Sequence, residues 1–359
     1  MKKLLSLIIR LLILSIVVIA GIVTIKTAGV SSRQVIIEPI TPSNIPDGAE
    51  QRFSKAIQIP TISSPDQFNK EAFLELDSFI QKSYPHVDSM IDKLDITPLS
   101  LVYKWSGKNS DLTPVLLMGH SDVIPIEKAT VNQWEEEPFS GMIKDGFIWG
   151  RGTLDDKISI FSILESVEKL LSEDYIPSRT IYLAFGHDEE IGGENGALKI
   201  AQWFEKQNIE LEYILDEGML IIEDALAGLD QPTALIGVAE KGFVTLSLTA
   251  KLEEGGHSSM PPRETTISVL SKAIVSLQEN PFPAKIDGAT SAFFEHVAPE
   301  MSWPYRALFS NKWLTEGLII NQLTKEAAAG AMVRTTTAPT LINGGVKDNV
   351  LPTQASATV

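Results

Sequence analysis

Four short polar clusters, each at the end of an apolar run, constrain this chain more than any other feature. They are Gly-His-Ser-Asp at 119–122, Gly-Arg-Gly-Thr-Leu-Asp-Asp-Lys at 150–157, His-Asp-Glu-Glu at 187–190 and Asp-Glu-Gly at 216–218. Each cluster offers carboxylate or imidazole groups where a buried strand is expected to end. Because open α/β sheets bind ligands at the carboxyl ends of their strands, the spacing predicts one shared site.

The segments around these clusters alternate between strand-like and helix-like patterns. Strands are expected over 99–105, 114–119, 179–186 and 211–216, a hairpin over 142–149, and helices from about 66, over 158–171 and over 194–207. This order predicts an α/β fold whose mixed sheet is covered by helices. Further along, a strand over 242–250, a helix over 265–278 and strand-like runs over 331–337 and 349–359 predict a smaller α+β domain.

These patterns divide the chain into four predicted regions. They are a membrane anchor or signal segment (1–26), a stalk (27–63), a site-bearing domain (64–241) and the smaller α+β domain (242–359). The last run, 354–359, has no turn or cap behind it and is expected to be an unpaired strand. We therefore expect the smaller domain to be incomplete and the chain to be truncated at its C-terminus.

The N-terminus has the pattern of a membrane-directed segment. Lys2, Lys3 and Arg10 precede an uncharged run, 11–25, and Lys26 closes it. Together with 4–9, this run is long enough for a hydrocarbon core of ~30 Å. The positive flank predicts a single-pass protein whose remainder lies on the extracytoplasmic side. The alternative is a signal peptide cleaved after Ala20, which would give a secreted protein.

Charge and cysteine content narrow the possible ligands. The formal net charge of −16 argues against nucleic acid as a partner. The chain has no cysteine, so a metal would have to be held by His, Asp and Glu.

The residues within the clusters suit such a metal site. His120 and Asp122 are two apart at a strand end and face the same side, as in a metal-binding imidazole oriented by a carboxylate. A second carboxylate, Asp155, follows a Gly-Arg-Gly turn and could bridge two ions. Glu189 and Glu190 diverge in extended backbone, so one can bind metal while the other acts as a base. Asp216 supplies a further oxygen.

The chain resembles the two-zinc metallopeptidase and aminoacylase family, in particular its carboxypeptidase S and N-fatty-acyl-amino-acid synthase/hydrolase branch. The matching motifs lie at 119–122, 149–155, 188–193, 255–259, 333–337 and 345–350. The resemblance implies two zinc ions, one held by His120, Asp155 and Asp216, the other by Asp155 and Glu190. It also implies that Glu189 is the general base and that Asp122 orients His120.

The same resemblance extends to the smaller domain. It implies that this domain is a lid through which the protein forms a homodimer, and that His257 reaches the partner subunit's active site. Asn349 is expected near the substrate. Relatives complete the second zinc site with a C-terminal histidine, for which this chain shows no counterpart.

Three functions remain open at this level. The first is a zinc hydrolase that releases an amino acid from a small peptide or an N-acyl amino acid. The second is an N-fatty-acyl-amino-acid synthase/hydrolase, which the N-terminal anchor and an apolar stretch favour. That stretch contains Phe293, Phe294, Trp303, Tyr305, Leu308 and Phe309. The third is a catalytically inactive, membrane-tethered binding protein.

Overall fold

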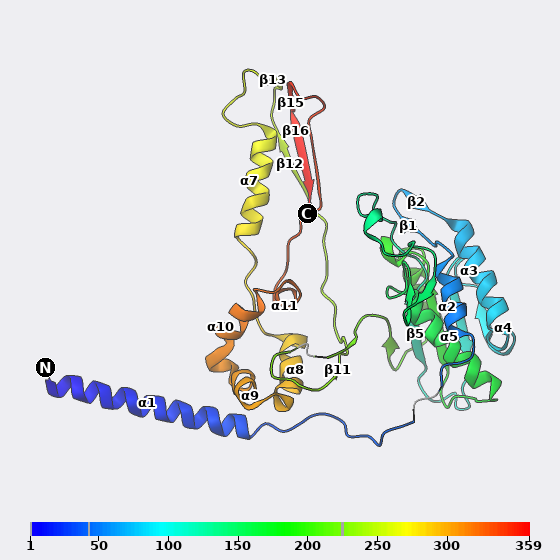
Figure 1. Ribbon diagram of the computed structural model, residues 1–359, viewed down its shortest axis with the longest axis horizontal. Coiled ribbons are helices and arrows are strands. Elements are labelled where there is room, and N and C mark those ends of the chain that lie inside the picture. Colours follow the sequence, from blue (N-terminus) through cyan, green and yellow to red (C-terminus); the bar gives the residue numbers. More distant parts are fainter. Residues whose placement is uncertain (1, 42–43, 224–225) are drawn as a thin grey trace. The chain divides into compact units, whose positions relative to one another are not determined.

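A computed structural model describes residues 2–41, 44–223 and 226–359 of the chain (Figure 1). Two compact units divide it: Pro39–Gly218, and a second unit that joins Met1–Glu38 to Met219–Val359. The predicted stalk and site-bearing domain include 42–43 and 224–225, which lie outside the described residues. The predicted domain limits therefore stay predictions.

A five-stranded mixed sheet forms the centre of the Pro39–Gly218 unit. Its strands, in spatial order, are β3 (Asp92–Leu94), β4 (Leu101–Trp105), β8 (Ile181–Gly186), β5 (Val115–His120) and β9 (Ile214–Leu215). The strands β8, β5 and β9 are parallel, whereas β4 and β3 run antiparallel. The predicted α/β sheet is confirmed, and the carboxyl ends of its three parallel strands meet at one edge.

Helices cover both faces of this sheet, as the alternation within β8 requires. On one face, Leu183 and Phe185 belong to the main core, which is completed by helices α2 (Ala49–Ile57), α3 (Lys70–Ser83), α4 (Pro85–Met90) and α5 (Lys157–Ser172). On the other face, Tyr182 packs with Phe204 of α6 (Ala197–Lys206). Their ring centroids are 5.0 Å apart in an edge-to-face arrangement.

Helix α2 lies within the segment predicted to be a stalk. Its Phe53, Ala56 and Ile57 are buried in the main core. The ammonium group of Lys157 fastens the end of α2, because it donates hydrogen bonds to the carbonyl oxygens of Ala56 (2.9 Å) and Ile59 (2.6 Å). Burial lowers the pKa of Lys157 to about 7. This part of the predicted stalk therefore belongs to the folded unit.

Two hairpins complete the unit. The predicted hairpin is confirmed as β6 (Met142–Lys144) and β7 (Phe147–Trp149), in which Lys144 pairs with Phe147. Its turn residues Asp145 and Gly146 both have positive φ, as a type I′ turn requires. The second hairpin, β1 (Ser63–Ser64) with β2 (Gln67–Phe68), is shorter. A 3₁₀ turn, η1 (Val131–Gln133), precedes β6.

The second unit contains a three-stranded antiparallel sheet in the order β12 (Ser247–Lys251), β16 (Gln354–Thr358) and β14 (Leu341–Gly344). Helix α7 (Thr266–Glu279) packs against it through Leu270, which meets Ala355 and Ala357. The prediction that the final strand is unpaired is wrong, since β16 lies in the middle of this sheet. Two further strand pairs are β13 (Gly256–His257) with β15 (Val350–Leu351), and β10 (Ile221–Ile222) with β11 (Thr233–Ala234).

A group of helices follows α7 in the sequence. It consists of α8 (Gly288–Val297), η3 (Ala298–Glu300), α9 (Trp303–Ser310), α10 (Lys312–Leu323) and α11 (Ala327–Ala331). The predicted strand over 331–337 is wrong, because its first residue ends α11 and the rest is irregular. Phe294 and Phe309 stack with their ring centroids 4.5 Å apart and form part of the local core.

The N-terminal helix α1 (Lys2–Ala28) belongs to the same unit by its contacts. It is the one helix in the described part of the chain that is long and apolar enough to cross a membrane. Almost all its side chains are exposed, and only Thr27 near its end is buried. A predicted membrane-directed segment is therefore present as a continuous helix.

Candidate metal centre

The ends of the three parallel strands carry the acidic and imidazole groups singled out in the sequence. His120 is the last residue of β5, the Asp188-Glu189-Glu190 run follows β8, and Asp216 follows β9. Asp155 enters from the loop that precedes α5. Because β8, β5 and β9 are parallel neighbours, their ends bring together side chains that are almost 100 positions apart in the sequence.

His120 is the buried centre of the site. One ring nitrogen, Nδ1, lies 3.2 Å from Asp122 Oδ1 and 3.1 Å from the Asp122 carbonyl oxygen. The other, Nε2, points to carboxylates: Asp155 Oδ1 lies at 2.9 Å, Glu217 Oε1 at 3.4 Å and Glu189 Oε2 at 3.9 Å. A metal-binding imidazole needs this arrangement, in which a second group fixes the nitrogen that does not face the ligands.

Asp122 has no exposed surface and does more than orient the imidazole. Its two carboxylate oxygens accept hydrogen bonds from the backbone N–H groups of Glu189 (3.1 Å) and Glu190 (3.0 Å). These two glutamates lie in a 3₁₀ turn, η2 (Glu189–Ile191), so the predicted extended backbone at this point is wrong. The turn ends at Gly192, whose φ of 100° suits glycine. A single carboxylate therefore positions both the histidine and the Glu-Glu pair.

Asp156 ties the start of α5 to β5. Its Oδ2 accepts a hydrogen bond from the backbone N–H of His120 at 3.1 Å, and its Oδ1 accepts one from Ser159. Gly119 makes this approach possible, since a Cβ there would lie 2.7 Å from Asp156 Oδ2. The preceding Asp155–Asp156 peptide bond is cis.

Among the residues that the structure describes, two overlapping groups of side chains could each hold a metal ion, and both include His120. The first is His120, Asp155 and Glu190, and the second is His120, Asp156 and Glu217. Within each group, the ligand atoms lie within 4.8 Å of one another. Asp155 is open to an incoming ion, because 70% of its side chain is exposed.

The site contains more carboxylates than cationic groups, and a divalent cation would balance this negative charge. Burial raises the pKa values of Glu189, Glu190 and Glu217, the last to about 7; the charges of neighbouring acids add to this rise, whereas His120 opposes it. Burial alone would lower the pKa of His120, but the hydrogen bond to Asp122 and the charge of Glu217 raise it to about 10. Crowded carboxylates around one imidazole form a donor set that zinc accepts.

The structure brings together most of the predicted site residues and adds others. His120, Asp122, Asp155, Glu189 and Glu190 lie together, as described above. Asp216 is in neither candidate metal group, so its role as a ligand stays a prediction. The sequence did not predict Glu217 or Asp156 as site residues. Each directly follows a predicted ligand, so the pairs of adjacent acids could have indicated them.

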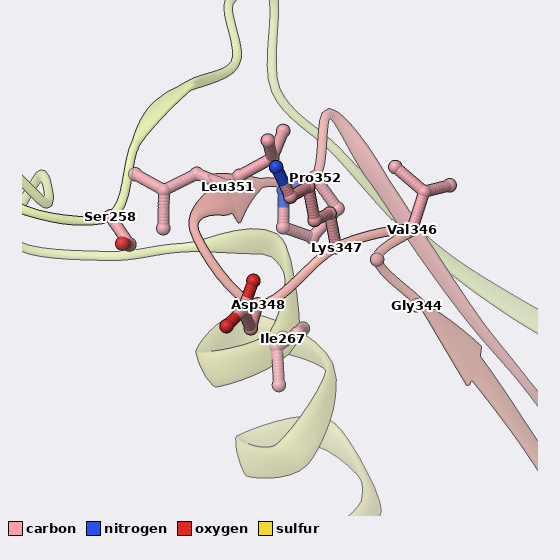
Figure 2. A pocket seen from close by; sticks show the side chains of 10 residues that line it. Ser258, Ile267, Gly344, Val346, Lys347, Asp348, Leu351 and Pro352 are labelled. Carbon is pink, nitrogen blue, oxygen red and sulfur yellow. The ribbon is translucent and has the colours of Figure 1, made fainter.

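His257 and Asn349 lie in the second unit and are neighbours there. His257 is in β13, beside Val350 of β15, and the backbone N–H of Ser258 donates to the Asn349 carbonyl oxygen at 3.1 Å. The imidazole is exposed, and its Nδ1 is 2.8 Å from Ser259 Oγ. Figure 2 shows the adjacent hollow, about 470 Å³ in volume, with Ser258, Lys347 and Asp348 on its wall. The predicted roles of His257 and Asn349 in catalysis stay predictions.

Comparisons with known proteins point to one peptidase family. Residues 116–310 match the family described as peptidase family M20/M25/M40. A probable carboxypeptidase S-like 2 of Dictyostelium discoideum is 42% identical over 370 aligned positions, which cover 99% of this chain and 70% of that protein. The N-fatty-acyl-amino acid synthase/hydrolase PM20D1.1 of Danio rerio is 42% identical over 311 positions, which cover 86% of this chain and 60% of that protein.

A similar fold is known from experiment. The M20 family metallo-carboxypeptidase Sso-CP2 of Sulfolobus solfataricus superposes with a TM-score of 0.56 at 22% identity, covering 87% of this chain and 70% of that one. This chain thus spans between three fifths and seven tenths of the length of these three proteins. The extent and identity of these matches establish the family: the chain belongs to peptidase family M20/M25/M40.

Proposed function

We propose that this chain carries the catalytic site of a two-zinc hydrolase that cleaves the amide bond of a peptide or an N-acyl amino acid and releases an amino acid. One observation carries the proposal. His120 is buried, its Nδ1 lies against Asp122, and its Nε2 faces carboxylates; His120 forms one candidate ligand group with Asp155 and Glu190 and another with Asp156 and Glu217. A divalent ion held by such a set would supply metal-assisted hydrolysis, and the second zinc is proposed from the family resemblance.

His120, Asp155 and Glu190 would hold zinc. On the family resemblance, we assign Asp216 to the same zinc ion as His120 and Asp155. The next residue, Glu217, contacts His120 Nε2 through its carboxylate. When bound, zinc polarises a substrate carbonyl and lowers the pKa of a coordinated water.

Glu189 is suited to move the proton of that water. Burial raises the pKa of its carboxyl group, which brings it closer to the range where it can both accept and release a proton. We infer that Glu189 takes the proton during attack on the amide carbonyl and gives it to the leaving amine. His257, through its exposed imidazole, would donate a hydrogen bond to the oxyanion in the partner subunit's site of a homodimer, and Asn349 would contact the substrate.

A long-chain N-acyl amino acid is the second candidate substrate, as in the Danio rerio relative. The observation that favours it is the apolar helix α1, which we propose to span the membrane and to hold the protein at the extracytoplasmic surface. A cleaved signal segment is the alternative reading of the same helix. Part of the apolar stretch cited for lipid contact does not support it, because Phe293, Phe294 and Phe309 pack in a protein core.

The test compares hydrolysis of a long-chain N-acyl amino acid with that of a blocked dipeptide by the zinc-loaded full-length protein. Hydrolysis of either confirms the amide hydrolase, and a gain in kcat/KM with acyl length supports the lipid reading, since each buried methylene contributes up to ~0.8 kcal/mol. Glu189→Gln should keep its zinc and lose turnover by about 10²–10⁴-fold. Zinc-loaded protein with no activity on either substrate would instead favour the third reading, an inactive binding protein.

A further inference from the structure

The last turn of α1 is built into the helices α9 and α10. Asn311, which has no exposed surface, joins them: its amide nitrogen donates to Thr27 Oγ1 at 3.1 Å and to the carbonyl oxygen of Ala307 in α9 at 2.8 Å. Its amide oxygen accepts a hydrogen bond from Trp313 Nε1 in α10 at 3.3 Å. One buried side chain therefore connects the end of an apolar helix to two helices that are almost 300 positions away in the sequence.

Further contacts continue the junction on either side. The ammonium group of Lys26 lies 5.6 Å from the ring centroid of Trp313, within the range of a cation–π interaction. Beyond α1, the side-chain amide of Gln34 donates to the carbonyl oxygen of His296 at 3.1 Å, and Arg33 pairs with Glu295 at 3.4 Å. The segment that follows α1 is therefore held against α8 by these contacts.

This junction fixes the depth of α9 and α10 relative to any bilayer that α1 spans. Lys26 is the first charged residue after the apolar run, so it marks the headgroup level. The 27 residues of α1 rise roughly 40 Å, which is enough for a hydrocarbon core of ~30 Å with both ends in the headgroups. Trp313 contacts Lys26 and therefore lies at the same level.

Large apolar side chains are exposed on these same two helices. The exposed fractions are 58% for Trp303 and 38% for Tyr305 in α9, and 53% for Trp313, 48% for Leu314 and 66% for Leu318 in α10. Leu314 and Leu318 are four residues apart and share one face of α10. Tryptophan and tyrosine prefer the membrane–water boundary, because their rings are apolar and each has a polar end.

We propose that Trp303, Tyr305, Trp313, Leu314 and Leu318, here called the α9–α10 surface, form a lipid-binding surface that enters the headgroup region of the bilayer from which α1 emerges. This inference rests on the membrane anchoring by α1 that is part of the proposed function. Its partner is zwitterionic lipid: the chain has a net charge of −16, so attraction to anionic lipid does not drive the contact. We infer lipid as the partner because the α9–α10 surface adjoins the end of α1, the helix proposed to span the bilayer.

The test uses the full-length protein reconstituted in phosphatidylcholine vesicles, part of whose lipid carries bromine on the upper acyl chain. Bromine quenches only nearby tryptophans, and the chain contains six. A double variant, Trp303→Phe with Trp313→Phe, removes the two on the surface. The matched control, Trp134→Phe with Trp149→Phe, removes two from the Pro39–Gly218 unit with equally conservative changes.

We expect bromolipid to quench the unsubstituted protein and the control, and to quench the Trp303→Phe/Trp313→Phe variant at most one third as much. Replacing a third of the phosphatidylcholine with phosphatidylserine should leave the quenching unchanged. Protein that floats with the vesicles while all three forms show the same quenching overturns the lipid-binding surface but leaves the anchor intact. Protein that does not float with the vesicles overturns the anchor and this inference together, without bearing on the hydrolase site.

Discussion

The two compact units of this chain differ in which side chains they bury and which they expose. The Pro39–Gly218 unit buries charge: His120 and Asp122 are almost fully enclosed at a strand edge, with further carboxylates around them. The second unit exposes apolar surface, on α1 and on the α9–α10 surface. Buried charge is stabilised by pairing or by a metal ion, and a large exposed apolar surface often marks a binding face. The comparison is consistent with the proposed metal site in the first unit and the proposed membrane attachment through the second.

The largest effect should come from removing the shared imidazole. His120→Ala should lose about half or more of the bound zinc, because both candidate ligand groups contain His120. The matched control is His187→Ala, a second buried histidine in the same unit that hydrogen-bonds Ser100 Oγ at 2.7 Å and lies in neither group. Metal analysis of both purified full-length variants checks this, and equal zinc content would remove the site from the Pro39–Gly218 unit.

The site was predictable because its parts are local. His120, Glu189 and Glu190 lie at or just after the ends of strands whose apolar runs are visible in the sequence, and parallel strands bring these ends together, whereas Asp155 comes from the loop before α5. The finer roles were less predictable, because they depend on side-chain direction. Neighbouring acids such as Asp155 and Asp156, or Asp216 and Glu217, look equivalent in the sequence, and only the fold gives each its own direction.

The second unit was harder to predict for a physical reason. The partners of β16 are β12, about 100 positions earlier, and β14, so its central position leaves no local trace. In the helices after α7, aromatic residues alternate between core and surface within a few positions: Phe309 is packed in the core whereas Trp313 is 53% exposed. Composition alone therefore could not separate core aromatics from surface ones.

A moderate effect should follow from changing the carboxylate that organises the site. Asp122→Asn keeps the size of the side chain but turns one acceptor into a donor, which then faces the backbone N–H of Glu189 or Glu190. It also weakens the bond that orients His120. We expect zinc affinity to fall about 10–100-fold. Competition with a chelator measures the change, with Asp111→Asn, an exposed loop aspartate, as the control. Equal affinities in the two variants would limit Asp122 to a structural role.

The smallest effect concerns the junction in the second unit, and it tests whether the two units are energetically separate. Asn311→Ala removes the hydrogen bonds that join α1, α9 and α10. The loss should be modest, since Thr27 Oγ1 keeps its bond to the Val23 carbonyl oxygen, Trp313 is exposed enough to bond water, and the Asn311 side chain makes no capping hydrogen bond to α10. We expect a cost of about 1 kcal/mol.

Hydrogen exchange measures this cost locally, because a single unfolding free energy is poorly defined for a protein with two units. Amides of α9 and α10 should exchange about fivefold faster in Asn311→Ala, which is the change that about 1 kcal/mol implies. Amides of β5 should be unaffected, and Asn321→Ala, an exposed position in α10, should change neither set. Faster exchange in β5 would show that the units unfold together, whereas unchanged exchange in α9 would show that Asn311 contributes nothing to the junction. Only a change confined to α9 and α10 supports a locally stabilised junction that is independent of the candidate metal site.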